Sequence, residues 1–237
     1  MAVDVVLFGS HPDDVEWGAG GISLLLRDHS VSFAIVDLTN GEMGSRGTTE
    51  ERKLEAQRAA EYLGASVRES LNMPDGALVD SPQARKQIAG VIRRYRPALV
   101  LAPFWKDRHP DHTAAGRMVR NSILHCTLRK SDDPNPPHKP ATFLYYLLHH
   151  FTHPTFVVDI SHVYDSKLEL LKIHDSQFSK TAEDFGLIPL GVSDYLFGLE
   201  SRDRFFGSLI GVHHGEALVS DTPVKLATAT QILSVFT

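Results

Sequence analysis

The sequence predicts an α/β fold, a Rossmann-like three-layer arrangement in which helices cover both faces of a mainly parallel sheet. Two observations support this prediction. Short β-branched or aliphatic runs alternate with amphipathic segments through residues 1–103, and helices between strands imply parallel crossover connections. The chain has 237 residues without an internal repeat, linker or low-complexity tract, so we expect a single α/β domain over residues 1–237.

Four strands and three helices are expected in the first half of the chain. The strands are short apolar runs bounded by Gly, Asn or Pro, at residues 3–9, 31–39, 65–71 and 98–103. The helices alternate with them, at residues 14–27, 49–63 and 82–95. The second helix has the clearest boundaries, because Thr48 and Glu51 have the spacing of a capping box and Gly64 follows the last turn.

The second half of the chain is less regular. Residues 131–140, SDDPNPPHKP, predict a proline-rich surface loop. Strands are expected at 142–148 and 155–159, and a helix at about 161–175. A last helix is expected at 193–209, although Gly198 and Gly207 weaken its pattern.

The composition favours a small-molecule ligand. A formal net charge of -5 disfavours a nucleic-acid or anionic-membrane surface, so neither partner is expected. Cys126 is the only cysteine, which excludes an internal disulfide and a thiolate zinc cluster within the chain. The amino terminus lacks a basic signal-peptide segment, and no run approaches the ~18 apolar residues of a membrane helix. We therefore expect a cytoplasmic protein.

Polar residues follow the first and fourth expected strands, where ligands bind in open α/β sheets. His11 lies at the exit of the first strand, and Asp14 falls in the first turn of the next helix. HPDH at 109–112 follows the fourth strand and brings a second imidazole, His112. Two imidazoles and one carboxylate leave an open position for water, as in catalytic zinc sites. The pattern predicts Zn²⁺ bound by these residues, although Fe²⁺, Co²⁺ and Mn²⁺ accept the same ligands.

Asp13 has a separate expected role. It points away from Asp14 along the backbone, so it is poorly placed to share the metal, but it can accept a proton from water beside the ion. The simpler alternative is that both acids belong to a helix start, where the helix dipole favours negative charge. HPDH alone could likewise be a solvated helix start. The two segments together, at strand ends of one sheet, favour the catalytic interpretation.

Two segments resemble the signature motifs of a known family. SHPDDVE at 10–16 and HPDH at 109–112 are similar to those of the LmbE-like, or PIG-L, family of zinc-dependent N-acetylglucosamine deacetylases. The resemblance covers most of the chain and includes residues 37–56, 71–78, 102–112, 174–178 and 204–218. Within the family, these segments are most similar to the bacillithiol-pathway branch, which removes the acetyl group from N-acetylglucosaminyl L-malate.

The resemblance implies the same zinc ligands and the same base, and it adds further catalytic residues. It implies that His109 assists the tetrahedral intermediate and the departing amine, with Asp111 able to orient its ring. It also suggests Tyr195 as a hydroxyl donor to the reacting carbonyl oxygen. The alternative for Tyr195 is a core aromatic on an amphipathic helix.

Substrate recognition is expected to involve charged residues near the same edge of the sheet. The resemblance implies that Arg52 and Arg108 clamp the malyl carboxylates, because guanidinium groups bind carboxylates through two parallel hydrogen bonds. Either arginine could instead form a surface ion pair, Arg52 with a glutamate on its own helix. Asp75 could accept a hydrogen bond from a sugar hydroxyl or simply belong to a turn. Lys139 stands where close relatives are expected to carry arginine, and lysine makes no bidentate contact.

Some of the remaining histidines form two groups without a matching acid at useful spacing. We expect them to be surface or packing residues, with the alternative that one lines the pocket mouth; they are His149, His150, His153, His213 and His214.

The leading hypothesis is a zinc-dependent deacetylase acting on a small-molecule glucosaminide, with N-acetyl-alpha-D-glucosaminyl L-malate as the first candidate. The main alternative keeps the chemistry but changes the substrate to free N-acetylglucosamine, a chito-oligosaccharide or a thiol S-conjugate. A non-catalytic sugar-binding protein with a structural metal is a further alternative, although it has no use for a base beside an open metal. A Rossmann-type nucleotide enzyme lacks GxGxxG after the first strand. By family likeness we expect a homo-oligomer, and a hexamer is one form of it.

Overall fold

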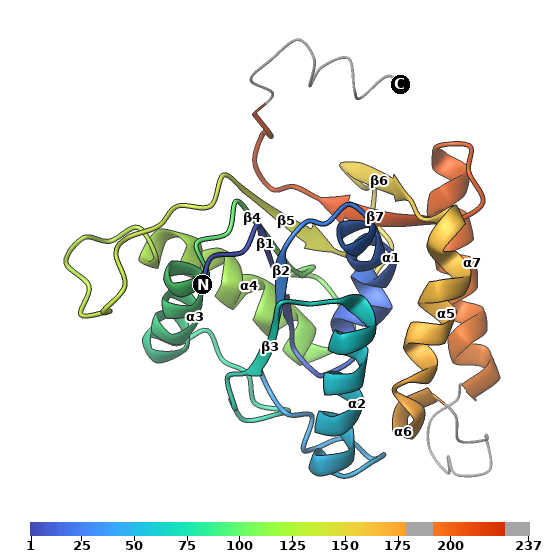
Figure 1. Cartoon of the computed structure of the whole chain (residues 1–237), viewed down its shortest axis with the longest axis horizontal. Coiled ribbons are helices and arrows are strands. Elements are labelled where there is room, and N and C mark those ends of the chain that lie inside the picture. The colour runs from blue at the N-terminus through green and yellow to red at the C-terminus, as the bar shows by residue number, and fades with distance from the viewer. Residues whose placement is uncertain (179–191, 226–237) are drawn as a thin grey trace.

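The computed structural model describes residues 1–178 and 192–225, without the side chains of residues 192–195. The expected α/β fold is confirmed, because the described residues form a seven-stranded, mostly parallel sheet covered by helices (Figure 1). The order across the sheet is β3-β2-β1-β4-β5-β7-β6. The strands are β1 Val5–Gly9, β2 Phe33–Asp37, β3 Val67–Ser70, β4 Leu99–Pro103, β5 Thr142–Tyr146, β6 Phe156–Asp159 and β7 Gly215–Val219.

Helices cover both faces of the sheet. They are α1 Asp14–Asp28, α2 Thr49–Leu63, α3 Pro82–Tyr95, α4 Pro110–His125, α5 Tyr164–Lys172, α6 Asp175–Phe178 and α7 Val192–Leu209, with a short 3-10 helix, η1 Ser161–Val163, before α5. Figure 1 shows α3 and α4 on one side, and α1, α2, α5 and α7 on the other. Among the described residues, no helix is both long and apolar enough to span a membrane.

The strand pairing gathers four loops at one edge of the sheet. β1 lies between β2 and β4 and is parallel to both, β3 is parallel to β2, and β5 is parallel to β4. The carboxyl ends of β1, β2, β3 and β4 therefore share one edge, and the segments that follow these strands meet there. β7 is antiparallel to both β5 and β6, so the far side of the sheet is antiparallel.

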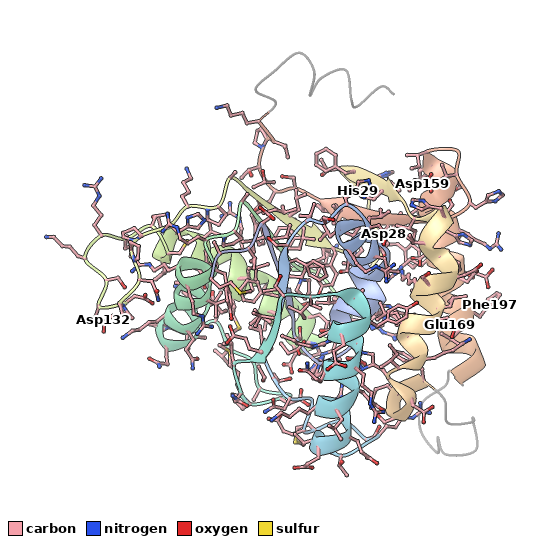
Figure 2. The ribbon with its side chains drawn as sticks, viewed as in Figure 1. Asp28, His29, Asp132, Asp159, Glu169 and Phe197 are labelled. Atoms are coloured by element: carbon pink, nitrogen blue, oxygen red, sulfur yellow. The ribbon has the colours of Figure 1, made fainter. Side chains whose placement is uncertain are left out.

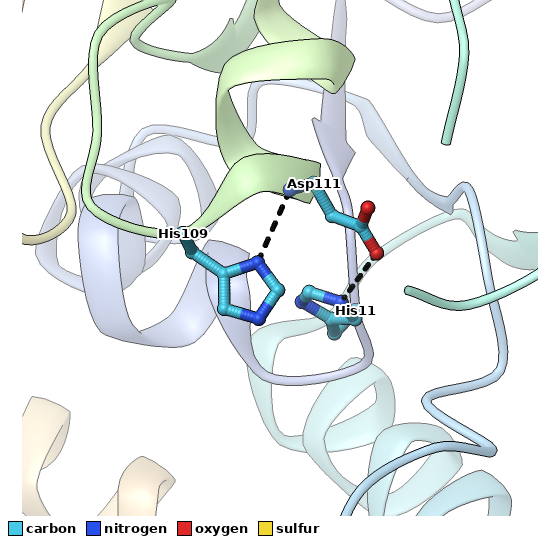
Figure 3. Close-up of side chains that lie close together, drawn as sticks. All are labelled: His11, His109 and Asp111. Atoms are coloured by element: carbon cyan, nitrogen blue, oxygen red, sulfur yellow. Dashed lines mark hydrogen bonds and ion pairs between the residues drawn. The ribbon is translucent and has the colours of Figure 1, made fainter. Parts of the chain in front are cut away.

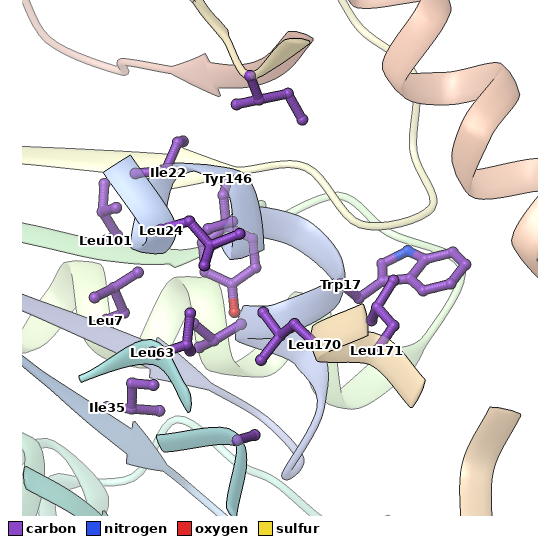
Figure 4. Close-up of a cluster of buried hydrophobic side chains, with 14 of the residues drawn as sticks. Leu7, Trp17, Ile22, Leu24, Ile35, Leu63, Leu101, Tyr146, Leu170 and Leu171 are labelled. Atoms are coloured by element: carbon purple, nitrogen blue, oxygen red, sulfur yellow. The ribbon is translucent and has the colours of Figure 1, made fainter. Parts of the chain in front are cut away.

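The described residues form three hydrophobic clusters. The two largest lie on opposite faces of the sheet, because successive side chains of a strand point to opposite faces. Leu7 and Ile35 pack toward α1, α2 and α5, where they meet Leu63 and Tyr146 (Figure 4). Phe8 and its neighbours on β2 and β4 pack toward α3 and α4 in the second core. Central strands that are buried on both faces are typical of a parallel sheet.

α1, which begins at the expected metal site, is anchored at a kink. Ala19 departs from helical geometry, with φ of -142°, and this frees backbone N–H groups further along the helix. Glu216 of β7 accepts hydrogen bonds from the N–H groups of Gly21 and Ile22 at 2.8 and 2.7 Å. The wholly buried Lys167 lies 2.7 Å from Glu216 and balances its charge.

Two expectations for the second half of the chain need correction. The expected helix at 161–175 is divided into η1, α5 and α6. A tertiary contact stabilises the new helix start, because Glu55 of α2 accepts hydrogen bonds from both the backbone N–H and the hydroxyl of Ser176, each at 2.7 Å. β7 was not expected at all, since its position is set by antiparallel pairing with strands distant in sequence.

Gly18→Ala is expected to reduce the free energy of unfolding by about 1–3 kcal/mol, because a Cβ atom at this position overlaps the Tyr146 ring, whose Cε2 would lie at 2.6 Å. The matched control is Gly198→Ala on α7, where an added Cβ meets no atom within 4 Å. Removing that helical glycine should raise stability by up to about 1 kcal/mol. Urea unfolding of both variants measures the difference, and equal effects would contradict the packing described here.

Candidate metal centre and catalytic site

Asp14 is the first residue of α1 and lies shortly after the end of β1. Its Oδ2 atom accepts hydrogen bonds from the backbone N–H groups of Ser10 at 2.8 Å and His11 at 3.0 Å. These bonds hold the carboxylate against the end of the strand, where its side chain is almost wholly buried. A buried carboxylate is costly without compensating positive charge, so the groups that face its two oxygens decide what the site can hold.

Two imidazoles face this carboxylate. The Nε2 atom of His112, in the first turn of α4, lies 3.2 Å from Oδ1 of Asp14, and Nδ1 of His11 lies 3.5 Å from Oδ2. Each of the three buried residues offers one possible ligand atom, and these atoms all lie within 4.8 Å of one another. Segments distant in sequence meet here because β1 and β4 are neighbours in the sheet.

The electrostatics of this cluster favour a cation. Burial alone would lower the pKa of His11, but the charge of Asp14 and hydrogen bonds to the surrounding carboxylates raise it to about 12. Burial also opposes the charged form of His112, yet Asp14 and Asp107 raise the pKa of that imidazole to about 9. A bound divalent cation would supply this positive charge in place of the protons, and both imidazoles would then be neutral. Two imidazoles and one carboxylate suit Zn²⁺ or a similar ion, so the residues present fit such a metal.

Each of these histidines also has a carboxylate on its other ring nitrogen. Oδ1 of Asp75 lies 3.0 Å from Nε2 of His11, and Oδ1 of Asp107 lies 3.1 Å from Nδ1 of His112. Asp75 was expected at a sugar hydroxyl or in a plain turn, but it contacts His11 and also lines the pocket. Asp107 was missed by the sequence analysis, although it lies five residues before His112 in KDRHPDH.

Asp13 stands beside the cluster and is held by an arginine. Its Oδ1 atom accepts a hydrogen bond from Nη2 of Arg52 at 3.2 Å, and Nη1 of Arg52 donates to the carbonyl of Gly41 at 2.8 Å. Arg52 was expected to clamp substrate carboxylates or to pair with a glutamate on its own helix. The structure instead directs its guanidinium to Asp13, while Glu55 of the same helix accepts from Ser176.

His109 and Asp111 are neighbours, but not in the expected way (Figure 3). Nδ1 of His109 accepts a hydrogen bond from the backbone N–H of Asp111 at 3.2 Å. The Asp111 carboxylate turns away and accepts from the N–H groups of Gly76 at 2.7 Å and Leu78 at 3.3 Å, with Oδ2 3.5 Å from Nε2 of His11. The expectation that the Asp111 side chain orients His109 is therefore corrected, because the turn after β3 engages that carboxylate.

These residues open into a pocket of about 250 Å³. Apart from the polar residues already described, its wall contains Trp17 and Phe178, whose rings stack with centroids 5.7 Å apart. His149 also lines the pocket and stacks on His112 with ring centroids 5.5 Å apart. Of the three neighbouring histidines His149, His150 and His153, His149 is the one that lines the pocket. An apolar wall beside converging polar groups is the usual form of a small-molecule site.

The other residues singled out in the sequence lie elsewhere. Arg108 is exposed and is not among the described residues that line this pocket. Lys139 is exposed in the loop before β5, at the opposite edge of the sheet from the pocket. Tyr195 falls within α7, but its side chain lies outside the described residues.

The remaining members of the two histidine groups do pack or lie at the surface. His150 stacks on Phe104 with ring centroids 5.9 Å apart, and His214 stacks on Tyr164 at 3.6 Å. His153 and His213 are exposed.

Comparison with known proteins identifies the family. Residues 6–123 match the family model PIG-L, described as GlcNAc-PI de-N-acetylase. Diacetylchitobiose deacetylase of Thermococcus kodakarensis is 32% identical over 73% of this chain and 70% of its own length. A probable N-acetyl-alpha-D-glucosaminyl L-malate deacetylase 2 of Bacillus cereus is 29% identical over 78% of this chain and 88% of its own length.

A solved structure is similar to this chain over nearly its full length. The crystal structure of a conserved protein from Thermus thermophilus has a TM-score of 0.85 and 35% identity, and covers 96% of this chain and 98% of the other. The similarity is thus not confined to the two short motifs: it covers most of the sequence and also the fold. This chain belongs to the PIG-L, or LmbE-like, family of deacetylases.

Proposed function

We propose that this protein is a metal-dependent hydrolase that removes the acetyl group from an N-acetylglucosaminide. The observation that carries the proposal is the buried convergence of His11, Asp14 and His112 on one point at a pocket, with Asp13 on the same wall. We propose Zn²⁺ as the ion and these three residues as its ligands. When bound there, the ion would supply a Lewis acid that polarises the amide carbonyl and acidifies a water molecule.

Asp13 is the proposed general base. Its carboxylate accepts the proton of the attacking water, so that the oxygen can add to the acetamide carbon. Arg52 donates to one carboxylate oxygen of Asp13 at 3.2 Å, and Asp13 lines the pocket. The same carboxyl group can then return the proton to the departing amine, which releases acetate and the free glucosamine.

His109 is the proposed donor to the oxyanion. Because its Nδ1 atom accepts a backbone N–H, a neutral ring carries its hydrogen on Nε2. The His109 residue is exposed overall, but partial desolvation and the neighbouring His112 and His11 lower its pKa, so the neutral ring is the form we expect in the pocket. Its Nε2–H can donate to the carbonyl oxygen as negative charge develops there. Tyr195 remains a proposed second donor, supported by the motif resemblance alone.

Two aglycones are proposed for the substrate. N-acetylglucosaminyl L-malate is supported by the motif resemblance and by the Bacillus cereus relative. A second N-acetylglucosamine unit is supported by the Thermococcus kodakarensis relative and by the pocket itself. The guanidinium of Arg52 is already bonded to Asp13 and Gly41, and Trp17 and Phe178, which stack on each other, give the pocket an apolar wall. We therefore favour the neutral disaccharide.

Asp13→Asn should leave the zinc content unchanged and lower kcat/KM for deacetylation by about 10²- to 10⁴-fold, because an amide cannot take the proton of water. Acetate release and metal analysis of the same preparation measure both quantities. The control is Asp28→Asn, which removes an exposed acid from the far end of the same helix (Figure 2) and should leave both values unchanged. Full activity of the Asp13 variant would refute the proposed mechanism.

The aglycone proposal predicts that kcat/KM for N,N'-diacetylchitobiose exceeds that for N-acetylglucosaminyl L-malate by about tenfold or more, equivalent to ~1.4 kcal/mol of transition-state binding. Free N-acetylglucosamine should be slower than the disaccharide, since it lacks the second ring that reaches the apolar wall. The measurement is product analysis with zinc-reconstituted protein under identical conditions. A preference for the malyl compound would overturn this choice and favour a carboxylate clamp.

A further inference from the structure

The two proposed ligand histidines present different ring nitrogens to Asp14. His11 turns Nδ1 toward the carboxylate, at 3.5 Å, whereas His112 turns Nε2 toward it, at 3.2 Å. In each ring the nitrogen that faces away from Asp14 meets another carboxylate. Asp75 lies 3.0 Å from Nε2 of His11, and Asp107 lies 3.1 Å from Nδ1 of His112.

Hydrogen bonds to two backbone N–H groups fix the orientation of the Asp107 carboxylate, which contacts the His112 ring. Its side chain is only 1% exposed, and its Oδ1 atom also accepts the backbone N–H of His109 at 2.9 Å. Oδ2 accepts the backbone N–H of His149 at 2.9 Å. A carboxylate so fixed is an acceptor only, so the nitrogen of His112 that faces it must carry a hydrogen. The lone pair of the neutral ring then lies on Nε2, toward Asp14.

Asp75 constrains His11 in the same way from the loop after β3. Its Oδ2 atom accepts the backbone N–H of Met43 at 2.8 Å, and its own N–H donates to Glu42 at 2.9 Å. The hydrogen of a neutral His11 ring is therefore placed on Nε2, and the lone pair on Nδ1. Asp111, 3.5 Å from the same Nε2 atom, is a second and more distant acid.

We propose that Asp107 and Asp75 are positioning residues that fix opposite tautomers of the two histidines, so that a divalent cation is bound through Nδ1 of His11 and Nε2 of His112. This inference rests on the metal site of the proposed function and adds the residues that set its affinity. Carboxylates behind metal-binding histidines orient the ring and raise its basicity, and their loss typically lowers metal affinity 10- to 100-fold. Asp75 also connects His11 to the loop that contains Met43, another residue that lines the pocket.

The first experiment measures the Kd for Zn²⁺ by competition with a chromophoric chelator. Asp107→Asn should weaken binding by about 10- to 100-fold. Asp75→Asn should weaken it less, because Asp111 remains as a second acceptor for His11. The matched control is Asp80→Asn, which removes a carboxylate paired with Arg85 outside the pocket and should leave the Kd within about twofold of wild type.

The outcomes separate this inference from the proposed function. A wild-type protein that binds no Zn²⁺ would overturn the proposed function. A wild-type protein that binds Zn²⁺, together with an Asp107→Asn variant that binds equally tightly, would overturn only the positioning role. Circular dichroism of each variant distinguishes lost affinity from lost folding.

The second experiment needs no variant. Long-range ¹H–¹⁵N NMR of the zinc-loaded wild-type protein reports which ring nitrogen of each histidine carries a hydrogen. The expected result is Nε2–H on His11 and Nδ1–H on His112, with the metal on the other nitrogen of each ring. The same tautomer on both rings, or the reverse assignment, would overturn the proposal even if the variants failed to fold.

Discussion

The structure is organised around a buried carboxylate that must be balanced by positive charge. Asp14 is fixed by two backbone N–H groups at the end of β1 and has an imidazole facing each of its oxygens. Isolated charges of this kind are among the most costly groups to bury. The loops after β1, β3 and β4 therefore bring complementary groups to one point, and that point lies in the wall of the pocket.

Two groups of charged residues connect this point to neighbouring elements. Arg52 connects α2 to Asp13 and to the loop at Gly41. The wholly buried Glu16 of α1 binds Arg68 of β3, which also donates to both oxygens of Asp37 at the end of β2. Burial raises the pKa of Asp37 to about 6 even with that arginine beside it. Neighbouring elements at this edge are thus joined by charge as well as by packing.

The sequence predicted the parts of the molecule that depend on local pattern. Alternating strands and helices identified the fold class, and the carboxyl-end rule brought His11, Asp14 and His112 to one edge of the sheet. The sequence did not predict the direction in which side chains point at this edge of the sheet. Asp111 faces the turn at Gly76 instead of His109, and Arg52 faces Asp13, because contacts from other elements decide both. β7 was missed for the same reason, since pairing with strands distant in sequence defines it. Asp107 was missed although His112 is only five residues away, because the spacing does not show that the two side chains turn toward each other.

The central claim is that His11, Asp14 and His112 bind one divalent cation. Anomalous X-ray scattering at the zinc edge, from crystals grown with Zn²⁺, tests it most directly. The account predicts one strong peak about 2.0–2.2 Å from Nδ1 of His11, a carboxylate oxygen of Asp14 and Nε2 of His112. A peak elsewhere, or ordered protein without a peak at this position, would contradict it.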